Sequence, residues 1–163
     1  MCSSDLLGNA RMVAYSAGGP SLDPGNMDLS ARLPAMVSLV AADIPPLTLT
    51  SSARPLVGST FQLTSNNILP GTILGATLLS FLQISPSLDL GALGAPGCMQ
   101  SVAPDFTQIF LAAGASGSTP LTIPNFASYS GLQLFAQSAA FTAGYNSLGI
   151  VTSNGLNLTI GNL

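Results

Sequence analysis

The 163-residue chain contains very few side chains that could do acid–base or nucleophilic chemistry. It has no His, Lys, Glu or Trp, so a general base would have to be Asp, Tyr, Cys or a terminal amine. Catalytic triads of Ser, His and Asp and dyads of Ser and Lys are therefore excluded. Asp89 and Asp105 could in principle act as a carboxylate pair in glycoside hydrolysis, but both lie beside turn residues, where Asp usually hydrogen-bonds to the backbone. We predict that the protein is not an enzyme.

The same inventory restricts metal and cofactor sites. Zinc sites need clusters of Cys or His, and the chain has two Cys and no His. Calcium takes oxygen ligands, so Asp89 together with loop carbonyls could form a weak site. No loop of regularly spaced Asp residues accompanies it, and we assign no metal ligand and no cofactor. A calcium-stabilised cell-surface module is kept as an alternative function.

The charge balance excludes nucleic acid and anionic membrane surfaces as partners. The chain has three Arg and six Asp, a net charge of −3, and no positive side chain after Arg54. Phosphate groups and anionic lipids are bound through clusters of Lys and Arg, which are absent here. The longest apolar stretch, residues 73–84, is interrupted by Gly and polar residues and is too short to span a bilayer. We predict no transmembrane segment.

The composition also indicates a cellular compartment. Charged residues make up 6% of the chain, against about a quarter in typical soluble domains. Solubility must therefore come from Ser, Thr, Asn, Gln and Gly, although the mean hydropathy is as high as +0.54. This combination favours a secreted or cell-surface protein.

Residues 1–46 are predicted to differ from the rest of the chain. Met1 to Leu6 can be encoded by a nucleotide string that looks like the end of a common sequencing adapter. We therefore expect that the chain is truncated at its N-terminus, that Cys2 is not native, and that a signal peptide has been lost. The following residues mix Gly, Pro, Asp and short apolar pieces. We interpret residues 1–46 as a truncated extension or the tail of a preceding module, and residues 47–163 as one domain.

From residue 47 onward the apolar residues follow the two-residue period of β-strands. Residues 60–64 alternate strictly, which places Phe61 and Leu63 on one face. Residues 72–84 are predicted to form a strand buried on both faces, with a bulge at Gly75, or a pair of buried strands. Before these residues we predict a strand at 47–50. After them we predict a strand or short helix at 106–112, a loop at 114–120 and a short strand at 121–123.

Asn154 and Gly155 give the strongest hairpin signal in the chain, because a type I′ turn needs a positive φ at both of its central residues. We predict a turn at this pair, between strands at 148–152 and 156–160. Many short strands at about ten-residue spacing indicate an all-β, antiparallel β-sandwich of about seven to ten strands, Ig-like or jelly-roll-like.

Tyr129 is the best candidate for a ligand contact, because sugar-binding platforms use exposed aromatic rings. The alternation of residues 132–137 predicts that Leu132, Leu134 and Ala136 point inward, and that Gln133 and Gln137 point outward. We therefore name Tyr129, Gln133 and Gln137 as a candidate ligand surface. The alternative is that Tyr129 covers an end of the sandwich.

Residues 87–98 hold three glycines and Cys98, and we interpret them as the connection between the two halves of the domain, with Gly97 and Cys98 in structural roles. Other short motifs occur in order: Pro55 and Gly58, Leu121 to Asn125, Gly131 to Gln137, and Ser153 with Asn154. Together these features resemble a C-terminal module of uncharacterised secreted proteins from planctomycete-like environmental bacteria.

The resemblance implies an extracellular β-sandwich appended to a larger protein. It also implies that Cys98 pairs with a cysteine nearer the N-terminus. For this chain two alternatives are open: the partner was lost with the truncated end, or Cys98 is a free, buried thiol.

The function that we predict is a non-catalytic extracellular module with a structural, adhesive or anchoring role in a larger secreted protein. Its partner would be a neighbouring domain, a cell-surface component or another copy of the chain. The alternative is a carbohydrate-binding module.

Overall fold

The computed structural model describes residues 45–162. These residues form nine β-strands and two single-turn 3-10 helices, so the prediction of an all-β fold with about seven to ten strands is confirmed. The strands are β1 (Thr48–Ser51), β2 (Thr60–Asn66), β3 (Leu74–Ser80), β4 (Gln83–Asp89), β5 (Met99–Val102), β6 (Phe106–Leu111), β7 (Ser116–Thr122), β8 (Gln133–Phe141) and β9 (Ile150–Thr159). The helical turns are η4 (Gly91–Leu93) and η5 (Ala127–Tyr129).

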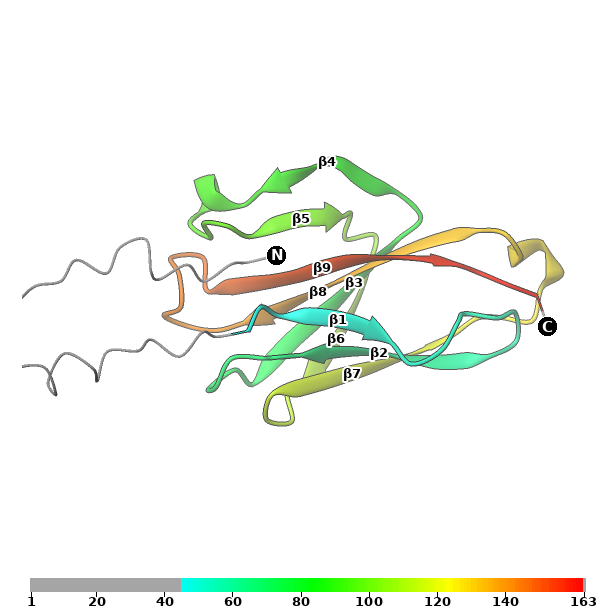
Figure 1. The fold of residues 1–163 in the computed structure, drawn as a ribbon, viewed down its shortest axis with the longest axis horizontal. Helices are drawn as coiled ribbons and strands as arrows, with labels where there is room; N and C mark the ends of the chain where they lie inside the picture. Colours follow the sequence, from blue (N-terminus) through cyan, green and yellow to red (C-terminus); the bar gives the residue numbers. More distant parts are fainter. Residues whose placement is uncertain (1–44, 163) are drawn as a thin grey trace, which may run out of the picture. The chain divides into compact units, whose positions relative to one another are not determined.

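Two antiparallel sheets build a sandwich, and a hairpin is added to it (Figure 1). One sheet has the order β1-β2-β7 and the other the order β6-β3-β8-β9. Strands β4 and β5 pair only with each other and form the separate hairpin. Phe61 and Leu63 of β2 are both buried, as their alternation predicts, and they pack with Leu79, Leu134 and Ala136 of the facing sheet.

The two sheets are also joined by pairs of hydroxyl groups. Ser65 of β2 and Ser138 of β8 share a hydrogen bond of 2.6 Å, and both side chains are fully buried. Thr77 of β3 and Thr119 of β7 share one of 3.0 Å. Each hydroxyl satisfies its partner, so these polar groups do not incur the penalty of an unpaired buried donor or acceptor.

The ring of Phe110 fills a gap between the sheets that two glycines leave open. Phe110 lies on β6 and is 5% exposed. A Cβ atom at Gly75 of β3 would lie 2.3 Å from its Cζ atom, and a Cβ atom at Gly117 of β7 would lie 2.3 Å from its Cδ2 atom. Glycine is therefore required at both positions, because any other residue would overlap the ring.

Of the two alternatives for residues 72–84, the pair of strands is confirmed and the single strand is wrong. The pair is β3 and β4, which are joined by a tight turn at Phe81 and Leu82. The pairing of β3 runs without a register shift through Gly75, so there is no bulge at that residue. The glycine makes room for the Phe110 ring instead. The predicted loop at 114–120 is also wrong, since β7 begins at Ser116.

The predicted hairpin turn at Asn154 and Gly155 is wrong as well. Both residues lie inside the continuous strand β9, at a register shift opposite Ser138, and neither has a positive φ. The Asn154 side chain bonds to the backbone of Leu49 on β1, as a neighbouring strand would. Its Oδ1 accepts the Leu49 N–H at 2.9 Å, and its Nδ2 donates to the Leu49 carbonyl at 3.2 Å. The amide therefore joins β9 to β1 across the open side of the sandwich.

Residues 90–98 close the β4–β5 hairpin. Gly97 has a φ of 75°, which favours glycine, and Leu90, Ala95 and Cys98 are buried in the core. Cys98 is disulfide-bonded, so the free-thiol alternative is wrong. The described residues contain no second cysteine. Cys2 lies outside them, and so do residues 1–44 of the predicted extension.

The Phe110 contact predicts a specific sensitivity at Gly75. Gly75→Ala should lower the free energy of unfolding by about 1–3 kcal/mol, because the added methyl group overpacks the core. Urea unfolding measures this loss. Gly155→Ala is the matched control: its Cβ would meet only the Ser101 Cβ, at 3.6 Å, so stability should change by less than about 0.5 kcal/mol. Equal stability of the two variants would contradict the account of Phe110.

Candidate functional site: a polar cleft and an apolar sheet edge

The three residues of the predicted ligand surface do not form one surface. Tyr129 is half-buried against the core and packs edge-on against Phe126, with ring centroids 5.7 Å apart. It therefore covers part of the core, as the alternative interpretation states. Gln133 is exposed at the start of β8. Gln137 was predicted to point outward to solvent, but it is only 1% exposed.

Gln137 is buried because the β4–β5 hairpin covers it. Its Oε1 accepts the Ser101 N–H at 2.8 Å, and its Nε2 donates to the Met99 carbonyl at 2.7 Å. Nε2 also donates to the Ser153 carbonyl of β9 at 2.9 Å. One amide thus holds β5 against β8 and β9. The alternation along β8 places Gln137 correctly on the face opposite to Leu134 and Ala136, but it cannot reveal that another hairpin covers that face.

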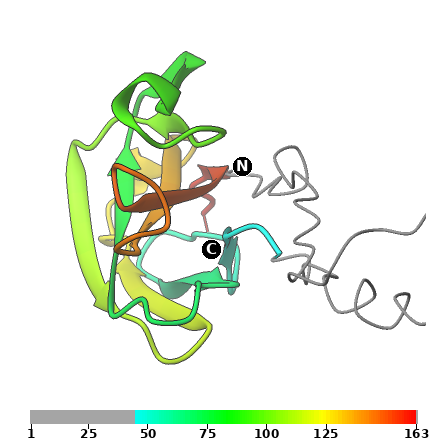
Figure 2. The same cartoon turned by 90° about the vertical axis from the view of Figure 1, so that its left-hand side faces the viewer.

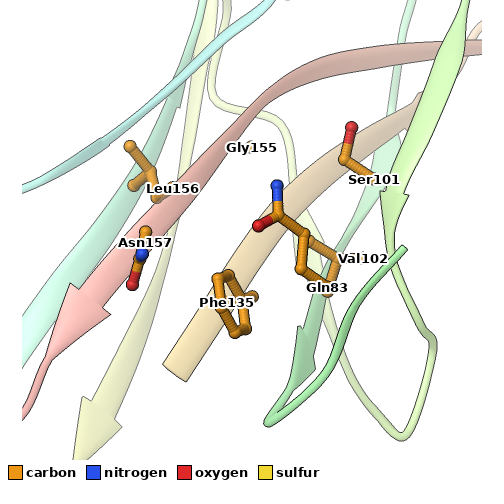
Figure 3. A pocket seen from close by; sticks show the side chains of 7 residues that line it. All are labelled: Gln83, Ser101, Val102, Phe135, Gly155, Leu156 and Asn157. Carbon is orange, nitrogen blue, oxygen red and sulfur yellow. The ribbon is translucent and has the colours of Figure 1, made fainter. Parts of the chain in front are cut away.

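A small cleft opens between this hairpin and the sheet (Figure 3). Gln83 and Ser101 line its hairpin side, Asn157 lies on β9, and Phe135 of β8 lies between them. Val102, Gly155 and Leu156 complete the lining. Its volume is about 160 Å³. Drug-sized ligands usually occupy roughly 300–1,000 Å³, so this cleft fits one small polar molecule.

The cleft offers hydrogen-bonding groups and no titratable group. The amides of Gln83 and Asn157 are exposed and make no hydrogen bond to other described residues. The Ser101 hydroxyl already bonds to Ser87 at 2.7 Å. Amides that both donate and accept, beside an aromatic ring, can bind a polyhydroxylated molecule, but they provide neither a nucleophile nor a general base.

The two carboxylates of the described residues lie apart from the cleft lining and make intramolecular hydrogen bonds. Asp89 Oδ1 accepts the Gly91 N–H at 2.8 Å, which is the expected backbone role of Asp at a turn. Asp105 instead accepts a hydrogen bond from the Ser80 hydroxyl. Within residues 45–162, no three His, Cys, Asp or Glu side chains gather where they could hold a metal ion. No helix in this part of the chain is long and apolar enough to cross a membrane.

A second surface lies on the outer face of the β6-β3-β8-β9 sheet. The strand register aligns Leu74 of β3 with Leu111 of β6 and Phe141 of β8, and Ile109 lies two residues before Leu111 on the same face. Their exposed fractions are 37% for Leu74, 71% for Leu111, 40% for Phe141 and 67% for Ile109. We call these four residues the outer apolar patch.

The outer apolar patch is uncharged and lies beyond the part of the face that the hairpin covers. The described residues contain only three charged side chains, Arg54, Asp89 and Asp105, and none of them belongs to the patch. Sequence reasoning missed the patch because it left residues 106–112 open between strand and helix. A strand assignment alone would have put Phe106, Gln108 and Phe110 on one face, and Ile109 and Leu111 on the other.

No family model matches the chain, and no curated protein matches its sequence. The function must therefore be argued from the geometry of the cleft and of the outer apolar patch.

The burial of Gln137 predicts that this side chain holds the hairpin in place. Gln137→Leu would remove the hydrogen bonds of its amide to the Ser101 N–H and to the Met99 and Ser153 carbonyls, and the Met99 carbonyl would keep only the one from the Thr152 hydroxyl at 3.0 Å. We expect a loss of about 2–4 kcal/mol in the free energy of unfolding and faster hydrogen exchange at the Ser101 amide. Gln133→Leu, an exposed change of the same type, should leave both quantities nearly unchanged. An unaltered exchange rate at Ser101 in Gln137→Leu would contradict this role.

Proposed function

We propose that the protein is a non-catalytic extracellular β-sandwich module that gives a larger secreted protein an adhesive or anchoring surface. The observation that carries this proposal is the outer apolar patch. Four large apolar side chains are exposed together on one sheet face, and no charged residue lies among them. Contiguous apolar patches on soluble proteins often mark interaction sites, because covering them releases ordered water.

The composition of the module supports the same function. A surface with few charges presents little electrostatic selectivity, so association would depend on shape, apolar contact and backbone hydrogen bonds. The disulfide at Cys98 supports export, since disulfides persist mainly in oxidising compartments. The partner would be a neighbouring domain of the same protein or a cell-surface component with an apolar face.

Adhesion of coated beads tests this function. Beads carrying the whole chain should be retained several-fold better on a methyl-terminated monolayer than beads carrying the Ile109→Ser, Leu111→Ser double variant. The control is Leu82→Ser with Leu93→Ser, which removes two apolar side chains with exposures of 71% and 60%, outside the patch. It should retain the binding of the unchanged chain. Equal retention of the two double variants would show that the patch does not mediate adhesion.

The cleft favours carbohydrate binding as a second candidate function. Its unpaired Gln83 and Asn157 amides beside Phe135 suit the hydroxyl groups and apolar face of one sugar ring. Under this function, a monosaccharide panel measured by NMR titration should reveal a ligand that Gly155→Val excludes by filling the cleft. Tyr129→Ala, which changes a residue outside the cleft lining, should still bind that ligand. Loss of binding in Tyr129→Ala, with binding retained in Gly155→Val, would instead place the ligand at Tyr129 and outside the cleft.

A further inference from the structure

We propose that Asn157 is a glycosylation site and that the first sugar of an N-linked glycan occupies the cleft beside it. Residues Asn157, Leu158 and Thr159 form the acceptor pattern Asn-x-Thr, in which the middle residue is not proline. The chain contains no other triplet of this pattern. The inference rests on the extracellular setting of the proposed function, because N-linked glycans are attached to secreted proteins.

Strand β9 presents both polar residues of the triplet on the same face. Asn157 and Thr159 are exposed, whereas Leu158 between them is partly buried and packs against the core that contains Phe61 and Leu63. Because side chains alternate along a strand, Asn157 and Thr159 point to the same side of the sheet. The amide and the hydroxyl that define the acceptor pattern therefore both reach solvent, on the side where the cleft opens.

Asn157 makes none of the contacts that explain other asparagines of the module. Asn154 bonds to the Leu49 backbone, and the Asn146 amide bonds to the Ile150 carbonyl at 2.7 Å and to the Ile150 N–H at 3.2 Å. The Asn157 amide makes no hydrogen bond to the described residues, although Asn is a disfavoured residue in strands. Its nitrogen is therefore accessible and has no structural partner to give up.

The attachment forms one bond and breaks one. The new bond joins the Asn157 Nδ2 atom to C1 of the sugar, and the amide loses one proton. The donor is an oligosaccharide linked to a lipid through a diphosphate group. Its bond between C1 and the diphosphate oxygen breaks, and the lipid diphosphate leaves with the electron pair. The chain supplies only the acceptor, and a glycosyltransferase of the exporting compartment catalyses the transfer.

The cleft beside Asn157 has the size and the lining for the first sugar. Phe135 of β8 lies directly opposite Asn157 in the strand register and lines the cleft. The Cβ atoms of such a pair are about 4.5–5.5 Å apart, so a sugar on Asn157 is within reach of the Phe135 ring. The exposed Gln83 amide lies across the cleft (Figure 3). One sugar ring can therefore pack its apolar face on the aromatic ring and bond its hydroxyl groups to the amide.

A glycan at Asn157 leaves the outer apolar patch open. Strands β9 and β6 are at opposite edges of their sheet, and in Figure 2 β6 (yellow-green) and β9 (red) lie apart, with β3 and β8 between them. On β8, the patch residue Phe141 is separated from Phe135 by about 20 Å at 3.4 Å per residue. The glycan would also hydrate a module that has few charged side chains, since N-linked glycans are bulky and solubilising.

Mass spectrometry of the whole chain, expressed behind an export signal in a host that attaches N-linked glycans, tests the attachment. The unchanged chain should gain the mass of a glycan, and a peptide N-glycosidase should remove it. Thr159→Val should abolish the gain, because it removes the hydroxyl and keeps Asn157. Thr159→Ser is the matched control: it keeps the hydroxyl and should still be modified. An exported chain without the added mass would overturn the proposal, and so would a gain that persists in Thr159→Val.

NMR of the chain with its glycan trimmed to the first sugar tests the position of that sugar. Nuclear Overhauser contacts are expected between the sugar protons and the Phe135 ring. Gly155→Val, which fills the cleft, should keep the sugar attached and lose these contacts. A sugar that makes no contact with Phe135 in the unchanged chain would overturn its placement in the cleft.

The outcomes separate this inference from the proposed function, because adhesion is measured on beads that carry the chain without a glycan. An exported chain that gains no glycan, while its beads still bind through the patch, overturns the glycosylation site and leaves the adhesive function standing. A glycosylated chain whose beads fail to bind supports the site and overturns the adhesive function. Failure of both measurements overturns both.

Discussion

The Phe110 ring between Gly75 and Gly117 fixes which side of β6 faces the core. A slip of one residue would turn Phe110 to solvent and place Ile109 or Leu111 over two glycines, where neither side chain could fill the gap as the ring does. Because side chains alternate along a strand, the inward position of Phe110 obliges Ile109 and Leu111 to point outward. The exposure of the apolar patch is therefore a consequence of core packing.

The module places many of its polar groups inside and leaves apolar side chains outside. Hydroxyl pairs such as Ser65 with Ser138 lie between the sheets, and the Gln137 amide lies under the hairpin with its hydrogen bonds made. This arrangement keeps the buried polar groups satisfied, and it aligns the sheets because each pair requires one register. It does not remove from water the apolar side chains that β6 and β3 leave exposed. A partner that covers the outer apolar patch would do so.

The sequence predicted what depends on local alternation and missed what depends on distant segments. The burial of Phe61 and Leu63 on the same face of β2 follows from the two-residue period of a strand. The all-β class follows from the same period. Asn154 and Gly155 have the composition of a hairpin turn. The Asn154 side chain instead bonds to the backbone of Leu49, which lies 105 residues away in the sequence. Gln137 and the cleft beside it depend on where the β4–β5 hairpin folds back, which no local pattern specifies.

The central claim is that the outer apolar patch is a binding surface. Methyl NMR of the whole chain, titrated with a nonionic detergent as an apolar probe, tests it most directly. The account predicts that the methyl signals of Leu74, Ile109 and Leu111 shift at lower detergent concentration than those of Leu82 and Leu93, which are exposed but lie outside the patch. Equal shifts at the two sets of residues would contradict it.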